Sequence, residues 1–428
     1  MINKIKNGGI TINRIFKKKF ITSILCLILI YLFAIKNITV SYKPIISAIN
    51  SRISFINNEL DFTNKQKGFV QKLDNFDNII NSIEDAINEN VYSRYRMIET
   101  YGYIQKLMCK NEISNFEVIK DKEGLMHYSY FTEEPNPIDI IGDNTERFKD
   151  NIKDKNIKFI YMMTPDKYVP GKTRFYKGLP YNYANETADN FLEYINRKNI
   201  DYIDLRKHIM DSPKNNSELF YKTDHHWRVE TAFDEFVNLA YKLNDEYGKE
   251  IKYLDYYTDE NNYNFVTYKN SFLGSMGRKT GYYYDGVDDF TVVFPKFKTN
   301  YTFYYRTGDH EVNLKGRFED ILINSHVLNN DRNIYSTESD KYSSYLMGNQ
   351  GVVHITNEDN KNGIKVMFIK DSYTVPLAAF LSTAVSDVYM IDPRSYDGDI
   401  TEYINNTELD VVIVSFYPQN LTEEFFKF

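Results

Sequence analysis

The chain has 428 residues, of which 42% are hydrophobic and 26% charged, a balance typical of a globular protein with one or two sizeable domains. Abundant Tyr (37) and Phe (29) with scarce Pro (11) exclude a disordered chain. The formal charge of −7 leaves no basic surface for nucleic acid beyond the first twenty residues.

An apolar run without charges covers residues 20–35 and follows a basic segment. Residues 1–19 carry six Lys or Arg and no acid, so the positive-inside rule keeps them in the cytoplasm and places everything after Lys36 outside. The run is slightly short for a spanning helix, but Lys19 and Lys36 can extend to the interface. A cleaved signal peptide is the alternative, although no small-x-small cleavage site follows. The sequence favours an uncleaved signal anchor at residues 20–36.

Residues 37–110 are polar and predict a helical stalk. Their isoleucines recur at helical spacing in two sets, namely Ile49, Ile53 and Ile56, and Ile80, Ile83 and Ile87. Cys109 is the only cysteine outside the membrane segment. Because one thiol forms no internal disulfide, an exported domain must rely on its own core.

From residue 111 to 428, short apolar runs alternate with helical patterns. Strands are predicted at 158–163, 200–205, 365–370, 387–391 and 410–417, and helices at 188–197, 376–383 and 400–406. This alternation predicts right-handed crossovers and a mostly parallel sheet with helices on both faces. A Tyr-rich alternating stretch at about 253–354 predicts a β-rich insertion.

Ligands of such sheets bind beyond the carboxyl ends of the strands. Ser372 follows the strand predicted at 365–370 and precedes a helix. A serine on such a turn exposes its hydroxyl, and nearby N–H groups can stabilise an oxyanion. A plain helix cap by Asp371, Ser372 or Thr374 explains the same residues without any catalytic role.

The stretch TDHHW, residues 223–227, supplies the groups that a serine nucleophile lacks. Asp224 stands two residues before His226, close enough on a turn to orient the imidazole as a base. The alternatives are a helix cap, packing of Trp227, and a metal site formed with His225. We expect no metal, because adjacent histidines diverge and no spacing such as HExxH is present.

Four motifs together resemble the bacterial DHHW proteins, relatives of the SGNH-like proteins that O-acetylate alginate and other exopolysaccharides. They are TPDKYVPGKTRFYKGLP (164–180), DLR (204–206), DHHW (224–227) and KDSY (370–373). The resemblance extends from about Tyr101 nearly to the C-terminus. It implies an SGNH-hydrolase-like three-layer α/β domain over residues 111–428, with no cofactor.

The resemblance also implies a catalytic triad of Asp224, His226 and Ser372, in an order permuted from the usual SGNH order, with His225 at a variable position. It points to FLGSMGR (272–278) and DPR (392–394) as loops that line the site. The further residues expected at the oxyanion or the substrate are Gly274 or Ser275 as backbone donor, Arg394 as a charge for a sugar or acyl oxygen, and Tyr373 and Trp227, the latter either against a sugar ring or packed beneath the triad.

These expectations describe an extracellular, membrane-anchored O-acetyltransferase of a bacterial cell-surface polysaccharide. The resemblance implies a membrane-bound acyltransferase partner that supplies acetyl groups. An esterase or polysaccharide deacetylase with the same triad is one alternative, since the outcome depends on how well the sugar excludes water. A non-catalytic scaffold of an export complex is the other.

Overall fold

The computed structural model describes residues 2–51 and 91–428, except 131, 155, 180–181 and 330–332, together with 80, 83–84, 86–88 and 90. The chain divides into two compact units, residues 1–98 and 99–428. Of the predicted stalk, Ile80, Ile83 and Ile87 are helical, whereas Ile53 and Ile56 lie outside the described residues.

The first unit contains the long helix α1, Ile2–Lys36, which continues through a π-helical turn at Asn37–Ser41. The stretch Phe16–Ser51 is helical and apolar enough to cross a membrane, and its most apolar part is not buried by protein. A helix satisfies its own backbone hydrogen bonds, so such a segment suits a lipid environment. The anchor predicted at residues 20–36 lies within this helix, while the orientation and the domain boundaries stay predictions.

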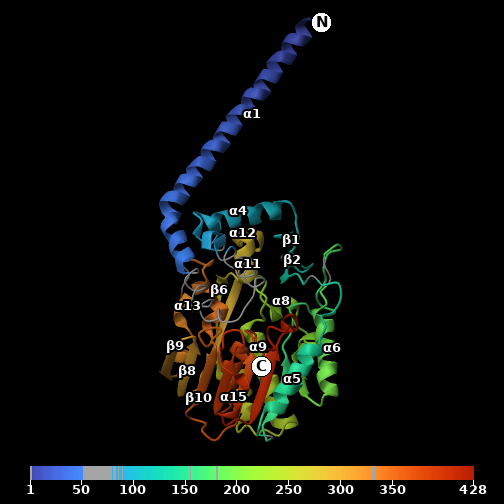
Figure 1. Ribbon diagram of the computed structural model, residues 1–428, viewed down its shortest axis with the longest axis vertical. Helices are drawn as coiled ribbons and strands as arrows, with labels where there is room; N and C mark the ends of the chain where they lie inside the picture. The colour runs from blue at the N-terminus through green and yellow to red at the C-terminus, as the bar shows by residue number, and fades with distance from the viewer. Residues whose placement is uncertain are drawn as a thin grey trace, which may run out of the picture. The chain divides into compact units, whose positions relative to one another are not determined.

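The second unit is built on an eight-stranded sheet with the order β5-β4-β13-β11-β12-β10-β8-β9 (Figure 1). Five neighbouring strands are parallel: β4 (Lys158–Met163), β5 (Asp201–Asp204), β11 (Lys365–Lys370), β12 (Asp387–Ile391) and β13 (Val411–Phe416). Three strands continue the sheet in antiparallel pairing: β8 (Tyr301–Thr307), β9 (His310–Gly316) and β10 (Val352–Asn357).

Both faces of the sheet are covered by helices, which form two hydrophobic cores. One core includes residues of α5 (Asp139–Asn151), α6 (Ala184–Arg197) and α15 (Ile400–Asn405), and the other residues of α9 (Val229–Tyr241) and α14 (Thr374–Leu381). Successive strand residues point to opposite cores, which is why the central strands read as unbroken apolar runs. The predicted α/β class with a mostly parallel sheet is confirmed.

The stretch predicted as an insertion holds two kinds of strand. The strands β6 (Tyr263–Phe272) and β7 (Asp288–Pro295) form a two-stranded sheet, whereas β8 and β9 extend the main sheet. Short helices accompany them, namely α10 (Leu254–Thr258), α11 (Ser275–Thr280), α12 (Tyr282–Asp285) and α13 (Ser325–Asn329). Part of this stretch therefore belongs to the main sheet.

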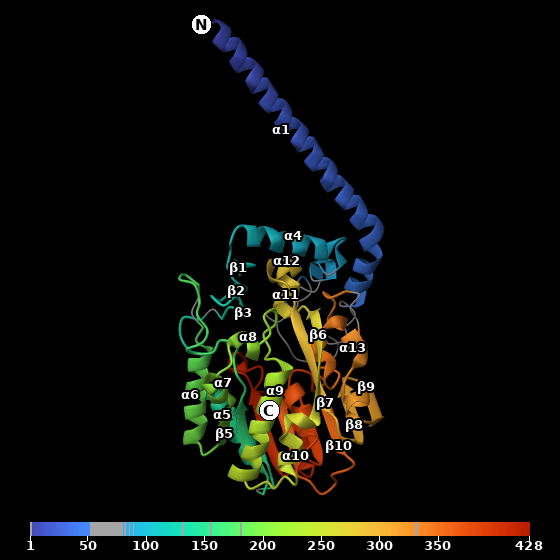
Figure 2. The same cartoon turned by 180° about the vertical axis from the view of Figure 1, so that it is seen from behind.

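The remaining elements of this unit lie before β4 or between β5 and α9. They are α4 (Arg94–Leu107), whose first residues belong to the first unit, the small sheet of β1 (Glu112–Ile113), β2 (Val118–Lys120) and β3 (Met126–Tyr128), and the helices α7 (Leu205–Asp211) and α8 (Asn216–Leu219). Figure 2 shows α4 and α12 together at one end of this unit and α10 at the other.

Candidate active site

Ser372 lies on the turn between β11 and α14, as the sequence predicts. The buried Asp371 holds this turn, because it accepts hydrogen bonds from the Tyr373 amide at 3.0 Å and from the Tyr417 amide at 2.8 Å. Burial raises the pKa of Asp371. Asp371 therefore stabilises the turn, and the Ser372 hydroxyl is free to make other contacts.

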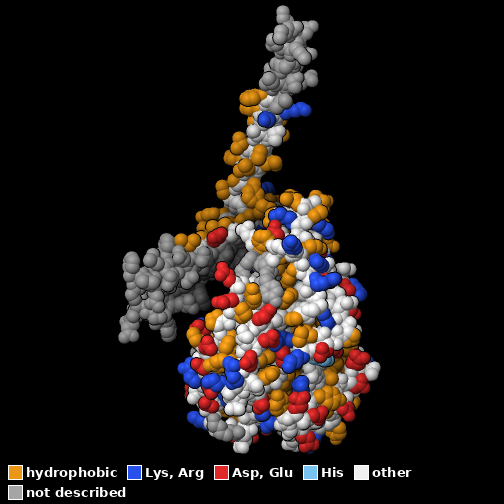
Figure 3. All heavy atoms as spheres, turned by 90° about the vertical axis from the view of Figure 1, so that its right-hand side faces the viewer, with side chains coloured by type: hydrophobic (Ala, Val, Ile, Leu, Met, Phe, Trp, Pro, Cys, Tyr) orange, Lys and Arg blue, Asp and Glu red, His pale blue; other side chains and the backbone are white. Residues whose placement is uncertain are grey.

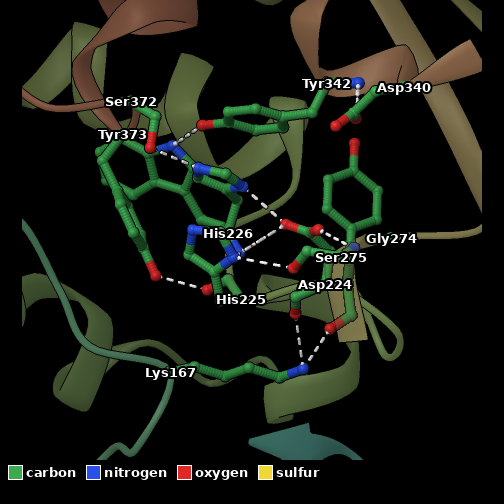
Figure 4. A network of polar contacts seen from close by, with 12 residues as sticks. Lys167, Asp224, His225, His226, Gly274, Ser275, Asp340, Tyr342, Ser372 and Tyr373 are labelled. Atoms are coloured by element: carbon green, nitrogen blue, oxygen red, sulfur yellow. Dashed lines mark hydrogen bonds and ion pairs between the residues drawn. The ribbon is translucent and has the colours of Figure 1, made fainter. Parts of the chain in front are cut away.

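The hydroxyl of Ser372 meets the two predicted partners in a continuous line (Figure 4). His226 Nδ1 donates to Asp224 Oδ1 at 2.6 Å, and the Ser372 hydroxyl donates to His226 Nε2 at 2.6 Å. The ionised carboxylate accepts only, so it fixes the tautomer and leaves Nε2 free to accept the serine proton. Serine, histidine and aspartate thus have the arrangement of an acyl-transfer triad.

The Asp224 carboxylate is buried and fully engaged. Its Oδ1 also accepts the His226 amide at 3.0 Å, and its Oδ2 accepts the Ser275 amide at 2.6 Å. Burial alone would raise the pKa of Asp224, but His225, His226 and these hydrogen bonds outweigh burial and hold the pKa well below its usual range. The carboxylate is therefore ionised when it orients the imidazole.

The turn that carries Asp224 is fixed from two sides. Asp288 accepts from the amides of Lys222 and Thr223, at 2.7 and 2.8 Å. Lys167, from the TPDK motif, is buried and donates to three main-chain carbonyls of this turn, including that of Asp224 at 2.8 Å. Burial lowers the pKa of Lys167 to about 8. The two opposite charges clamp the loop through its backbone.

The prediction that Gly274 or Ser275 offers a backbone donor to an oxyanion is wrong. The Gly274 amide donates to the Thr223 hydroxyl at 2.9 Å, and the Ser275 amide is used by Asp224. Gly274 is required for another reason, since a Cβ there would lie 2.3 Å from the Asp224 Cβ. This loop supports the carboxylate and leaves the oxyanion to other donors.

The Ser372 amide is available as such a donor. In the part of the chain that the structure describes, this N–H has no hydrogen-bond acceptor. It lies on the residue that carries the nucleophile, at the start of the turn into α14, where backbone amides favour negative charge.

His225 does not repeat the contacts of His226. Its Nδ1 lies 3.1 Å from the Ser275 hydroxyl and 3.6 Å from Asp224 Oδ1. Burial, reinforced by His226, lowers the pKa of His225 to about 3, so the ring is neutral at physiological pH. Potential metal-ligand atoms of Asp224, His225 and His226 lie within 4.8 Å of one another. A metal there would have to displace the His226 contacts to Asp224 and Ser372.

Two aromatic residues expected at the substrate are buried instead. Trp227 is fully buried and donates from Nε1 to the Tyr342 hydroxyl at 3.1 Å, so it packs beneath the triad and cannot stack on a sugar. Tyr373 is 1% exposed, and its hydroxyl donates to the His225 carbonyl. Trp227 thus takes the packed position, one of the two predicted for it, whereas the substrate role predicted for Tyr373 is wrong.

Arg394 is committed to its own loop. Its guanidinium donates to both carboxylate oxygens of Asp392, at 2.9 and 2.6 Å, and lies over the Phe425 ring. Asp392 also accepts from the buried Lys370 at 3.1 Å. The structure therefore gives Arg394 a local ion pair, and its predicted contact with an acyl or sugar oxygen stays a prediction.

Sequence reasoning missed Tyr342, which lies flat against the triad histidine. The rings of Tyr342 and His226 are 3.8 Å apart at 13° (Figure 4). Tyr342 comes from a short 3-10 turn, Lys341–Ser344, far along the chain. No signal in its Tyr-rich surroundings distinguishes it from other buried tyrosines.

Two comparisons with known proteins agree with this fold. Residues 137–259 match a family model described as the SGNH hydrolase-like domain of acetyltransferase AlgX. The structure of Bacillus cereus PatB1 with a sulfonyl adduct is similar, with a TM-score of 0.60 and 18% identity over 74% of this chain and 99% of that one. No curated protein matches significantly in sequence.

A DHHW family protein from Eubacterium siraeum is also similar, with a TM-score of 0.53 and 18% identity over 73% of this chain and 97% of that one. Fold and comparisons define the class as an SGNH hydrolase-like α/β protein. The particular resemblance inferred from the sequence, to DHHW proteins and SGNH-like acetyltransferases, is confirmed.

Proposed function

We propose that this chain is a membrane-anchored O-acetyltransferase that acts outside the bacterial cell on a surface or exported polysaccharide. The Ser372–His226–Asp224 hydrogen-bond line carries the proposal, because it is a complete acyl-transfer arrangement at the carboxyl end of the sheet. The match to an acetyltransferase family model supports acetyl as the group that is transferred. The helix at Phe16–Ser51 supports the anchor.

Transfer occurs in two balanced steps. His226 Nε2 takes the Ser372 proton as the serine oxygen attacks the acetyl carbonyl, and the departing donor group then receives that proton. A sugar hydroxyl next gives its proton to His226, attacks the acetyl-serine ester, and leaves Ser372 to recover the proton. General base catalysis of this kind contributes about 10²- to 10⁴-fold.

The proposal includes a membrane-bound acyltransferase as the source of acetyl groups. In the systems that this chain resembles the acetyl donor is cytoplasmic, and a single spanning helix provides no evident route for it. The partner need only present an acyl group to Ser372 on the outer side.

Incubation of the purified full chain with an acetyl ester, with and without oligosaccharide acceptors, tests the proposal. We expect acetylated sugar from the parent chain and none from Ser372→Ala. Free acetate at the same rate with or without acceptor would instead identify an esterase. Unchanged polysaccharide acetylation in cells that express folded Ser372→Ala would identify a scaffold.

A further inference from the structure

Helix α4 presents its large apolar side chains to solvent and its small or polar ones to the domain. Its buried residues are Gly102 and Gln105. A Cβ at Gly102 would lie 1.9 Å from the Thr280 carbonyl oxygen, so this glycine lets α4 approach α11 closely. Surface helices of soluble domains ordinarily bury their apolar stripe, and α4 does the reverse.

The exposed apolar residues of α4 and of the segments near it are together called the α4 patch. Leu107 and Met108 are 65% and 60% exposed, and Tyr103 packs edge-to-face on Tyr283 of α12 at 6.3 Å. Figure 3 shows hydrophobic side chains beside Lys and Arg at this end of the unit. The patch consists of Tyr101, Tyr103, Ile104, Leu107, Met108, Phe116, Tyr282 and Tyr283.

Basic residues accompany the α4 patch in a chain that is acidic overall. Residues 94–112 hold four cations and two acids, whereas the whole chain has a formal charge of −7. One of the acids, Glu112, pairs with Lys110 at 2.8 Å. The charged residues of this stretch are Arg94, Arg96, Lys106 and Lys110 against Glu99 and Glu112. Aromatic and aliphatic side chains mixed with Lys and Arg are typical of surfaces that lie in a lipid–water interface.

We propose that the α4 patch rests on the lipid interface of the same membrane that anchors the chain. This rests on the anchoring that is part of the proposed function. Large apolar side chains gathered on an exposed helix face mark an interaction surface. A membrane is the occupant that both the candidate span and the local positive charge favour, because a tethered domain meets the bilayer at high effective concentration.

Docking through α4 would orient the catalytic end of the sheet. The patch packs on α11 through Gly102, and α11 begins at Ser275, whose amide holds Asp224. The triad therefore lies on the lipid-facing side of the domain, where a donor in the membrane would present its acyl group.

Tryptophan quenching in lipid discs tests the docking with the full chain. Leu107→Trp places a reporter in the α4 patch, and Tyr253→Trp is the matched control, since Tyr253 is 78% exposed and adjoins α10 at the opposite end (Figure 2). The parent chain, with its buried Trp227, gives the background. We expect brominated lipid to quench the Leu107→Trp signal several-fold more than the Tyr253→Trp signal.

Equal quenching at the two positions would overturn the proposal, and so would no quenching at either. Discs that contain only lipid and one copy of the chain exclude a protein partner or a second copy as the cause. A second reporter, Met108→Trp, covers the case in which Leu107→Trp fails to fold. The measurement needs no acyl donor, so transfer without quenching refutes the docking alone, and quenching without transfer refutes the proposed activity alone.

Discussion

Two buried Asp–His pairs occur among the described residues, and they differ in what else surrounds the imidazole ring. In one, Asp224 binds His226 at 2.6 Å and the opposite nitrogen contacts Ser372. In the other, Asp121 binds His127 at 2.9 Å, and the ring packs edge-on against Phe175. Burial lowers the pKa of His127. An Asp–His contact is therefore a catalytic candidate only when a nucleophile completes it.

The carboxylates differ in the same sense. Asp224 accepts amides from its own turn and from Ser275, in a loop clamped by Lys167 and Asp288. Asp121 accepts the Leu125 amide at 2.8 Å and thereby closes the connection between β2 and β3. One pair is fixed so that its base faces a hydroxyl, and the other holds a loop together.

Matched amide substitutions give the largest expected contrast. Asp224→Asn should lower kcat/KM for acetyl transfer by about 10³- to 10⁴-fold, because the amide no longer enforces the tautomer that accepts the serine proton. Asp121→Asn should leave kcat/KM nearly unchanged and lower the melting temperature. Rates and melting curves of both variants decide it, and a comparable loss of activity from Asp121→Asn at unchanged stability would show that the second pair takes part in the chemistry.

Substitution of the two neighbouring histidines sharpens the contrast within one motif. His226→Ala should abolish transfer, with a loss of about 10³-fold or more, whereas His225→Ala should cost far less because His225 is not bonded to Ser372. Rates and metal content of the purified variants are the measurements. Equal and complete loss from both, together with loss of a bound metal, would replace the triad by a metal centre.

The sequence predicted the strands and motifs that form this site, because these follow from residue patterns. It did not predict the direction in which backbone amides and side chains of these motifs point. The strands at 158–163, 365–370 and 387–391 have the predicted bounds, because a strand buried on both faces is an unbroken apolar run. The motif around Gly274 does reach the site. Its amides point at Thr223 and Asp224, however, and only the turn geometry fixes that direction.

Apart from the triad, which the family resemblance implied, contacts between distant segments could not be predicted from one sequence. Asp288 and Lys167 hold the Asp224 turn from 64 and 57 positions away, and Tyr342 reaches His226 across 116 positions (288 − 224, 224 − 167 and 342 − 226). Trp227 follows the triad histidine directly in sequence, which suggested a contact with substrate. Its complete burial depends on how the core packs, and the sequence does not show that. Residues next to the catalytic motifs were therefore reasonable candidates for substrate contact, but only the fold shows which of them are buried.

Tyr342 provides a smaller contrast, since His127 has an edge contact with Phe175 where His226 has a stacked one. A stacked ring favours the imidazolium that forms during transfer and is worth about 0.5–1.5 kcal/mol. Tyr342→Leu should therefore lower kcat by roughly two- to tenfold. Tyr342→Phe, which keeps the ring and loses only the bond from Trp227, should cost less. The idea fails if both variants, equally stable, lose the same activity.

Asp166 lines a small cavity together with His127 of the second pair and His225, the neighbour of the triad histidine. Burial raises the pKa of Asp166 to about 6, even though it accepts the Tyr168 amide and the Gln419 side chain. The folded protein thus keeps a proton from pH 3.8 to about 6 that the unfolded chain has lost, so this group makes stability fall as pH rises through that window, by about 3 kcal/mol in total. Asp166→Asn should remove this fall. Melting temperatures of both proteins at pH 4, 5 and 7 test it, and parallel curves would show that Asp166 ionises normally.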